Sequence, residues 1–293
     1  MENEKKIFWI ASYPKSGNTL FRAILASLFL TNDGKFSFEL LNFIRFFETA
    51  NRLLFIKSEK PKNFKKINEI KILSKYWLEM QTQKRLKIKE SFCFLKTHSA
   101  LLKLYGNDFT NEKTSRGLIY LVRDPRDVTL SWAKHRNKSI ENTINFMINH
   151  DANVFYNDLD VLDNKELKPK LLMSRWDTHV SSWQYLNVPK LFLKYEDLIE
   201  NKKTTIHKVV NFFEKNYDFK FNNLDCKINN ILITTDFKSM KKTEEEQGFK
   251  EAKQHAKFFN VGKKDQWKDK LKPKEVKKIE KEFSKQMRKF NYL

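Results

Sequence analysis

The sequence is poor in cysteine and has no long apolar run. Only two of its 293 residues are cysteines, Cys93 and Cys226, and they lie far apart in the chain. This scarcity argues against a disulfide scaffold and against a thiolate metal site, and it fits a reducing compartment. The apolar stretches at residues 7–11 and 20–30 are too short for a secretory signal or for a membrane span of ~20 apolar residues. We therefore expect a soluble, cytoplasmic protein.

The chain also lacks a Pro-, Gly- or Ser-rich linker that would divide it. Its 40% of hydrophobic residues can build one large core, so we predict a single domain over residues 1–293. Acidic residues are outnumbered, 36 against 57 Lys and Arg, which gives a formal net charge of +21. Such a charge attracts nucleic acid, anionic membranes and polyanionic substrates alike. Most of the excess is lysine scattered at solvent-facing spacing, which we interpret as a solvated surface. A basic nucleic-acid-binding protein remains an alternative.

Four short apolar runs predict the sheet of the protein. They lie at residues 7–11, 92–95, 118–122 and 191–194. Nearly continuous hydrophobicity with β-branched or aromatic residues is typical of strands buried on both faces of a parallel sheet. We expect long helical stretches between them. The predicted fold class is α/β, a single domain with a central parallel sheet flanked by helices, and residues 35–90 form a Phe- and Lys-rich helical insertion.

The first predicted strand runs directly into a loop that can hold an anion. The loop reads Tyr13-Pro14-Lys15-Ser16-Gly17-Asn18-Thr19, and a helical pattern starts at about Leu20. The first amides of a helix are unpaired and its dipole favours negative charge, so a phosphate fits there. Lys15 adds a positive charge, and Ser16 and Thr19 offer hydroxyl donors. The nucleoside-triphosphate loop GxxxxGK[ST] is absent, because the lysine precedes the glycine. A structural alternative is that Asn18 or Ser16 only caps the helix.

The second predicted strand ends in Lys96-Thr97-His98. Polar residues at the carboxyl end of a parallel strand lie where open α/β sheets bind ligands. His98 is therefore a candidate general base, because an imidazole titrates near neutral pH and can accept the proton of a reacting hydroxyl. A packing or surface role for this histidine is the alternative.

The third predicted strand ends in an arginine. The chain reads Arg123-Asp124-Pro125-Arg126-Asp127, and a helix is expected from Pro125 through Ser131. The guanidinium of Arg123 presents a fork of donors that suits a phosphate. The alternative is that Arg123 and Arg126 only pair with the neighbouring aspartates.

Taken in order, these segments resemble the motifs of the PAPS-dependent sulfotransferase family (PAPS is 3′-phosphoadenosine-5′-phosphosulfate). The resemblance runs from about residue 7 to residue 268. Residues 13–19 are similar to the family's 5′-phosphosulfate loop, YPKSGTTW, with Asn18 and Leu20 as departures. The resemblance implies a P-loop-like nucleotide-binding architecture in which the donor is bound by Lys15, Ser16, Gly17, Asn18 and Thr19.

The same resemblance implies roles for the other two strand ends. His98 would be the catalytic base, and Lys15 and Lys96 would offset the charge that develops on the sulfonate and the departing phosphate. Arg123 and Ser131, at the family's spacing of eight residues, would bind the 3′-phosphate. The family's chemistry needs no metal, and none is expected here.

Three segments of the C-terminal half carry the rest of the resemblance. Tyr195 begins a YEDL segment, which lies near the adenosine in the family. The segment around Thr235 and Phe237 is similar to TSFxxM, with Asp236 in place of serine, and the resemblance implies contacts of Thr235 and Phe237 with adenine. A structural role for Tyr195 is the alternative.

The last segment, residues 258–268, resembles RKGxxGDWK but departs from it at two positions. Gly262, Trp267 and Lys268 align. Asn260 and Val261 replace the Arg-Lys pair that completes the 3′-phosphate site, which puts part of the clamp in doubt. Lys257, Lys263 or Lys264 could compensate, and we predict Gly262 and Lys263 as donor-binding residues.

The predicted function is transfer of the sulfonate of PAPS to a hydroxyl or amine of a small-molecule or glycan acceptor, with adenosine 3′,5′-bisphosphate as product. An atypical nucleoside-phosphate kinase is the enzymatic alternative. We interpret the phenylalanines of residues 35–90 as core, with an apolar acceptor wall as the minority interpretation, and His179 as a second-rank candidate for an acceptor contact. Neither the acceptor nor the oligomeric state follows from the sequence.

Overall fold

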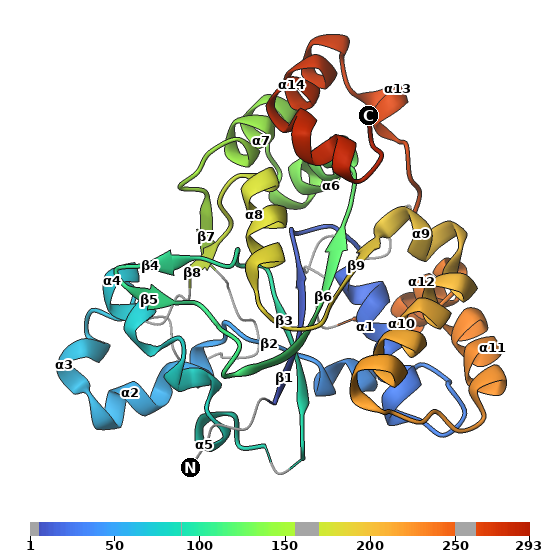
Figure 1. The fold of residues 1–293 in the computed structure, drawn as a ribbon. Coiled ribbons are helices and arrows are strands. Elements are labelled where there is room, and N and C mark those ends of the chain that lie inside the picture. The colour runs from blue at the N-terminus through green and yellow to red at the C-terminus, as the bar shows by residue number, and fades with distance from the viewer. Residues whose placement is uncertain (1–5, 89, 156–169, 250–261) are drawn as a thin grey trace.

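A five-stranded parallel sheet forms the centre of the fold. The computed structural model describes residues 6–88, 90–155, 170–249 and 262–293. The strands are β1 (Ile7–Ser12), β2 (Arg45–Phe46), β3 (Cys93–Thr97), β6 (Ser115–Val122) and β9 (Lys190–Lys194). Their order is β2-β3-β1-β6-β9, and each neighbouring pair is parallel (Figure 1). The four predicted runs correspond to β1, β3, β6 and β9, and the predicted fold class is confirmed.

The central strand β1 is apolar because both faces of the sheet are covered. All six residues of β1 are buried. Ile7, Trp9 and Ala11 pack into one hydrophobic core, and Phe8 and Ile10 pack into a second core on the opposite face. Burial of each large apolar side chain contributes about 1.5–3 kcal/mol, so the central strand can carry no polar position until its last residue.

Helices cover both faces of this sheet (Figure 1). On one face, α1 (Asn18–Leu30), α10 (Lys202–Tyr217) and α11 (Leu224–Thr234) supply the core that contains Phe8. On the other face, α6 (Pro125–Arg136), α8 (Trp176–Ser182) and α14 (Pro273–Lys289) supply the core that contains Trp9. The remaining elements of the C-terminal half are α7 (Ile140–Met147), η5 (Trp183–Tyr185), α9 (Tyr195–Glu200), α12 (Phe237–Gln247) and α13 (Trp267–Lys270).

Residues 35–90 fold into short helices beside the sheet, at the left of Figure 1 for the most part. They are η1 (Phe38–Phe43), η2 (Ala50–Leu53), α2 (Leu54–Glu59), α3 (Pro61–Phe64), α4 (Ile70–Leu73), η3 (Ser74–Tyr76), η4 (Glu79–Gln81) and α5 (Gln83–Leu86). The segment also contains the edge strand β2, which the sequence analysis missed. Phe46 and Phe47 are buried, whereas Phe43 is 66% exposed, so the phenylalanines do not act as one stripe.

One connection differs from the expected alternation of strands and helices. Between β3 and β6 the chain forms an antiparallel hairpin, β4 (Lys103–Leu104) with β5 (Asn107–Asp108), where a helical stretch was expected. Tyr105 and Gly106 have φ values of 51° and 81°, which suit the two central residues of a tight hairpin turn. A second antiparallel pair is formed by β7 (Asn153–Phe155) and β8 (Lys170–Leu172).

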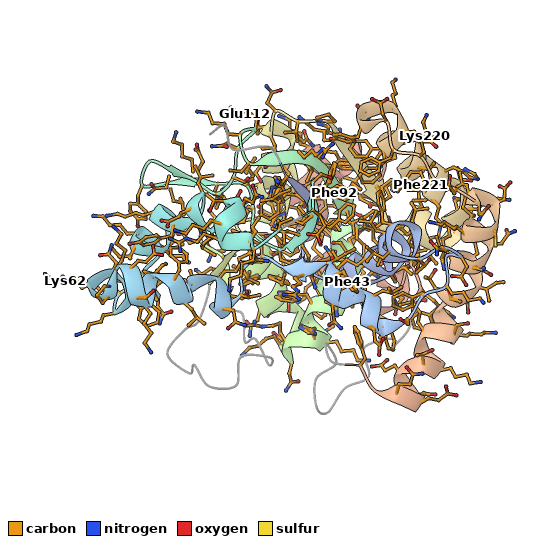
Figure 2. The ribbon with its side chains drawn as sticks, turned by 90° about the horizontal axis from the view of Figure 1, so that it is seen from below. Phe43, Lys62, Phe92, Glu112, Lys220 and Phe221 are labelled. Carbon is orange, nitrogen blue, oxygen red and sulfur yellow. The ribbon has the colours of Figure 1, made fainter. Side chains whose placement is uncertain are left out.

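Basic side chains extend from the periphery of the molecule. Lys62 and Lys220 are exposed and lie near opposite sides of the view in Figure 2, which fits the interpretation of a solvated lysine surface. Of the helices that the structure describes, none combines the length and the apolar character needed to cross a membrane.

Candidate donor and transfer site

The predicted site residues lie at the carboxyl edge of the sheet, beside its topological switch point. From β1 the chain first adds β2 and β3 on one side and then β6 and β9 on the other. Loops that follow the two strands at such a reversal diverge and leave room for a ligand. Here those strands are β1, which leads into the loop of residues 13–17, and β6, which leads into Arg123.

The loop after β1 makes a tight turn before α1 begins at Asn18. Lys15 and Gly17 both adopt left-handed backbone conformations, with φ values of 66° and 87°. A Cβ on Gly17 would lie 2.4 Å from Cδ2 of Tyr195, so only glycine lets the ring approach the loop. The loop therefore packs against the Tyr195 ring, which follows β9, and the first turn of α1 lies beside them.

Several buried polar atoms in this loop have no partner in the described part of the chain. They are the hydroxyls of Tyr13 and Ser16 and the Oδ1 atom of Asn18. Buried polar groups are nearly always hydrogen-bonded. The Ser16 hydroxyl, next to the start of α1, can donate to an oxygen-rich ligand, whereas Oδ1 of Asn18 can only accept. The capping alternative is not found, because the N-cap of α1 is Gly17 and no side chain caps it. Asn18 instead donates from Nδ2 to Oγ of Ser12, at 3.2 Å.

Arg123 connects three of the predicted donor-binding segments. Its Nη1 donates to the carbonyl of Lys15 at 2.9 Å, and its Nη2 donates to the carbonyl of Lys263 at 3.3 Å. The guanidinium also lies 4.1 Å from the centre of the Tyr195 ring, a favourable cation–π distance. Residues 15, 123, 195 and 263 therefore meet at one place although they are spread over most of the chain.

The neighbouring charged residues divide into structural and site groups. Arg126 pairs with Asp124 at 2.6 Å and with Glu280 at 2.5 Å, as the structural alternative for this arginine required. Arg123 lies farther from its acidic neighbour, 3.9 Å from Oδ2 of Asp127. Asp127 instead accepts hydrogen bonds from the amides of Asp265 and Trp267, at 2.8 Å and 3.1 Å, and so fastens the C-terminal turn to the site.

A second aromatic contact involves Phe237 and Gly262. A Cβ on Gly262, whose φ is 58°, would lie 2.3 Å from Cδ2 of Phe237, so the predicted adenine-contacting ring and the predicted glycine touch. Asp236 caps α12 by accepting from the amide of Lys238, which explains why an acidic residue serves in that position. Thr235 is fully buried and donates its hydroxyl to the carbonyl of Ile231 at 2.6 Å.

Two sets of predicted residues are not joined to this cluster by observed contacts. Ser131 lies in α6 and is half-buried, and no hydrogen bond between it and Arg123 is present in the described residues. Asn260, Val261 and Lys257, on which the doubtful part of the clamp depends, lie outside the described residues. Of the candidates for compensation, Lys264 pairs with Glu200 at 2.7 Å.

His98 lies at the end of β3, next to the loop. Its Nδ1 atom is 2.7 Å from the carbonyl oxygen of Ser12, which can only accept, so the ring proton sits on Nδ1 and Nε2 carries the lone pair. Phe46 faces this imidazole with a ring distance of 5.5 Å, and the ammonium of the buried Lys96 lies 4.9 Å from the same phenyl ring. Lys96, His98 and Phe46 therefore form one group at the strand end.

His179 is buried next to this group and contacts the main chain of His98. It is fully buried, with Nε2 3.0 Å from the carbonyl oxygen of His98 and Nδ1 2.8 Å from the hydroxyl of Tyr120. Burial lowers its pKa to about 4, so the ring is neutral at physiological pH. Both ring nitrogens are engaged within the protein, which gives His179 a structural position and does not support the predicted acceptor contact.

One residue of this region, Glu48, was not predicted from the sequence. It follows β2, is 5% exposed, and contacts the side chains on both sides of His98. A single glutamate in a Phe- and Lys-rich segment carries no sequence signal for such a position. In the described parts of the chain, no group of three or more His, Cys, Asp or Glu could hold a metal ion.

The fold and the loop after β1 together define an α/β protein with a P-loop-like architecture. Comparison with known proteins specifies the family: the family described as "Sulfotransferase domain" matches residues 5–291. The chain therefore belongs to the sulfotransferase domain family, and the family predicted from the motifs is confirmed.

Individual relatives are similar over shorter stretches. Sulfotransferase 2A6 of Mus musculus is 28% identical over 146 residues, which cover 48% of this chain and 45% of the relative. Sulfotransferase 1B1 of Canis lupus familiaris is 31% identical over 106 residues, 31% of this chain and 34% of the relative. The matched stretches thus span less than half of these relatives.

Solved structures of two proteins share the fold across nearly the whole chain. Mouse sulfotransferase SULT7A1, in complex with PAP, aligns with a TM-score of 0.58 at 17% identity, over 97% of this chain and 85% of that one. Retinol dehydratase, in complex with retinol and PAP, aligns with a TM-score of 0.58 at 19% identity, over 96% and 81%. This likeness confirms the architecture, and the roles of individual residues stay predictions.

Proposed function

We propose that the protein transfers the sulfonate group of PAPS to a hydroxyl or amine acceptor and releases adenosine 3′,5′-bisphosphate. Membership in the sulfotransferase domain family and the PAP bound by two proteins of the same fold support this proposal. The observation that carries it is Arg123, whose guanidinium contacts the loop at Lys15, the Tyr195 ring and the backbone of Lys263. These contacts support a role for Arg123 as the phosphate-binding cation between the loop and the predicted adenosine contacts.

On this proposal, different residues bind different parts of the donor. Lys15, the buried hydroxyl of Ser16 and the first amides of α1 bind the 5′-phosphosulfate, because they offer one charge and several donors at one helix end. Arg123 binds the 3′-phosphate, with Ser131 and Lys263 as further candidates. Phe237 stacks on the adenine against Gly262, and its ring contact supports this role.

His98 acts as the general base toward the acceptor. Its Nδ1 is held by the carbonyl of Ser12, so Nε2 takes the proton as the acceptor oxygen or nitrogen forms its bond to sulfur. When bound, PAPS supplies the sulfonate and a phosphate leaving group. Lys15 and Lys96 offset negative charge at the two ends of the reacting group, where fixed cations in a water-poor site are most effective.

The acceptor binds on the side of His98 that faces Phe46. The phenyl ring lies against both His98 and Lys96, which supports the minority interpretation of the insertion for this one phenylalanine: an apolar wall beside the reacting atom. Small molecules and glycans with an apolar face fit this chemistry. We also propose a cytoplasmic location, since both cysteines are free.

Calorimetric titration with adenosine 3′,5′-bisphosphate, against AMP and ATP, tests the donor site. We expect tight binding that requires the 3′-phosphate. Equal or absent binding of all three nucleotides would contradict the proposal and favour the kinase or nucleic-acid alternative. PAPS is then offered with a phenol, an aliphatic alcohol, a sugar and an amine, and mass spectrometry identifies which acceptor class gains a sulfonate.

A further inference from the structure

Glu48 lies beside the end of β3, although it belongs to the insertion. The amide of Phe47 donates to the carbonyl of Lys96 at 2.8 Å, which extends the pairing of β2 with β3 beyond Phe46. The next residue, Glu48, is therefore held alongside the Thr97–Ser99 segment. Its side chain is turned into the protein, with 5% of the residue exposed.

Two hydroxyl groups share one oxygen of this carboxyl group. Oγ1 of Thr97 is 2.5 Å and Oγ of Ser99 is 2.6 Å from Oε1 of Glu48. Each hydroxyl already accepts a backbone hydrogen bond, Thr97 from the amide of Ser99 at 3.0 Å and Ser99 from the amide of Leu172 at 3.2 Å. Both hydroxyls donate their single proton to Oε1, so Oε1 acts as an acceptor.

The second carboxyl oxygen has a different environment. Oε2 of Glu48 is buried and has no hydrogen-bond partner in the described residues. Burial raises the pKa of Glu48 to about 7, against the stabilising effect of both hydroxyls and of the nearby Arg52. Any proton that the group carries therefore resides on Oε2. An amide side chain can reproduce the acceptor role of Oε1, because its carbonyl oxygen also accepts two hydrogen bonds.

The segment is held from the opposite side as well. His179 binds the carbonyl of His98, and Nε1 of Trp183 donates to the carbonyl of Ser99 at 3.0 Å. These contacts fix the main chain, whereas Glu48 holds the side chains that flank His98. The imidazole itself is restrained by the bond of its Nδ1 to the Ser12 carbonyl, with Oγ of Ser12 and the Phe46 ring beside it. That bond is sensitive to a small rotation of the turn, because hydrogen bonds weaken steeply away from their best angle.

We propose that Glu48 is a positioning residue for His98. By holding the hydroxyls of Thr97 and Ser99 on one oxygen, Glu48 fixes the turn that keeps Nδ1 of His98 on the Ser12 carbonyl and presents Nε2 to the acceptor. The hydrogen-bonded oxygen, and not the negative charge, performs this function. The inference rests on the proposed function only for the role of His98 as base.

Long-range 1H–15N spectra of the imidazole rings test the proposal without any acceptor. The full-length protein is labelled in its six histidines, and the His98 signals are identified as those lost in His98→Ala. The wild type should show the tautomer protonated at Nδ1. Glu48→Ala should lose this pattern and show two averaged nitrogen shifts, whereas Glu48→Gln should retain it.

Thr97→Val and Ser99→Ala each remove one hydroxyl that donates to Glu48 and change the side-chain shape little. They therefore test the same turn if Glu48→Ala fails to fold. We expect partial averaging in both. Glu39→Ala, which changes an exposed glutamate of the same insertion, is the matched control and should leave the spectrum unchanged. With an acceptor from the screen, Glu48→Ala should also lower kcat about tenfold, the equivalent of one lost hydrogen bond to a charged group.

Two results would overturn the proposal. An unchanged His98 tautomer in folded Glu48→Ala, or in Thr97→Val and Ser99→Ala together, would show that Glu48 only stabilises the fold. Equal loss of the pattern in Glu48→Gln and Glu48→Ala would show that the charge acts, and not the accepting oxygen. Because adenosine 3′,5′-bisphosphate binding is measured separately, failure of the donor site is distinguishable from failure of this inference.

Discussion

The proposed donor side and the proposed acceptor side of this site are built in different ways. The donor side consists of strand-end loops, and most of its contacts involve the main chain: Arg123 binds two carbonyl groups, and Gly17 leaves room for the Tyr195 ring. The acceptor side is held by buried side chains, among them Glu48 and His179, which come from outside the strand that carries His98. The first side depends on backbone shape, and the second depends on side-chain chemistry.

This difference predicts where the site tolerates change. A donor that every family member shares can be bound by a fixed backbone, because amides and carbonyls do not vary with the sequence. An acceptor that differs between proteins needs surroundings that substitutions can alter, and the edge strand β2 with its short helices is such a region. Substitutions on the two sides should therefore affect different measurable quantities.

The largest effect is expected from the acceptor side. His98→Ala removes the proposed general base, and such groups contribute about 10²–10⁴-fold to the rate, so kcat for the best acceptor of the screen should fall by at least 10²-fold. Calorimetry should show nearly unchanged affinity for adenosine 3′,5′-bisphosphate. His150→Ala, at an exposed histidine, is the control. Full turnover of His98→Ala would show that another group accepts the proton.

On the donor side, Arg123→Ala should weaken nucleotide binding, in contrast to His98→Ala, which should lower kcat and leave nucleotide binding nearly unchanged. Hydrogen bonds to charged groups contribute about 1.5–3 kcal/mol, so affinity for adenosine 3′,5′-bisphosphate should fall about 10- to 100-fold. Affinity for AMP should fall much less, because AMP lacks the 3′-phosphate. Arg116→Ala changes an arginine at the other end of the same strand and should keep the preference. If Arg123→Ala also kept the preference for adenosine 3′,5′-bisphosphate over AMP, the 3′-phosphate would be bound elsewhere.

A glycine pair tests whether the donor side depends on backbone shape. In Gly17→Ala the left-handed backbone costs about 1–2 kcal/mol, and the added methyl group overlaps the Tyr195 ring. In Gly106→Ala the φ of 81° is equally unfavourable, but nothing lies within 4 Å. Both variants should unfold at a lower temperature, and only Gly17→Ala should bind adenosine 3′,5′-bisphosphate more weakly. Equal nucleotide affinity in the two variants would contradict the close approach of ring and loop.

A last prediction concerns the pH dependence of stability. The folded pKa of Glu48 is raised from its ordinary 4.5 to about 7 by burial. Between these values the folded protein retains a proton that the unfolded chain has released, so the Glu48 contribution to the free energy of unfolding decreases as pH rises and levels off above pH 7. Denaturant titrations should show this slope reduced in Glu48→Gln and unchanged in Glu39→Gln. An identical slope in Glu48→Gln would mean that Glu48 does not titrate there.

The contrast between strand-end loops and buried side chains from other segments also explains which parts of the site could be predicted from the sequence. The four long strands follow from continuous apolar runs, and the loop at residues 13–19, the turn at Lys96-Thr97-His98 and the corner at Arg123 each lie directly after such a run. These motifs are contiguous, so their position on the sheet edge follows from the strand alone. Most residues predicted for the donor could be placed in this way.

What the sequence could not predict are contacts between short or distant segments. β2 has two residues, too few for a periodic signal, and it nevertheless places Phe46 and Glu48 against β3. The hairpin after β3 depends on a turn at Tyr105 and Gly106, where only the glycine is a recognisable signal. The raised pKa of Glu48 results from its burial. One acidic residue in a lysine-rich segment gives no sign in the sequence that it will be buried.

The attachment of the C-terminal turn to Asp127 bears on how the protein is made. Arg123 and Asp127 receive their partners Lys263, Asp265 and Trp267 from a segment almost 140 positions later in synthesis. Closing so large a loop delays these contacts relative to local ones. On a ribosome, the sheet can form while the nucleotide site is still incomplete. A nascent chain would then gain affinity for the proposed donor only after residues 263–267 have been synthesised.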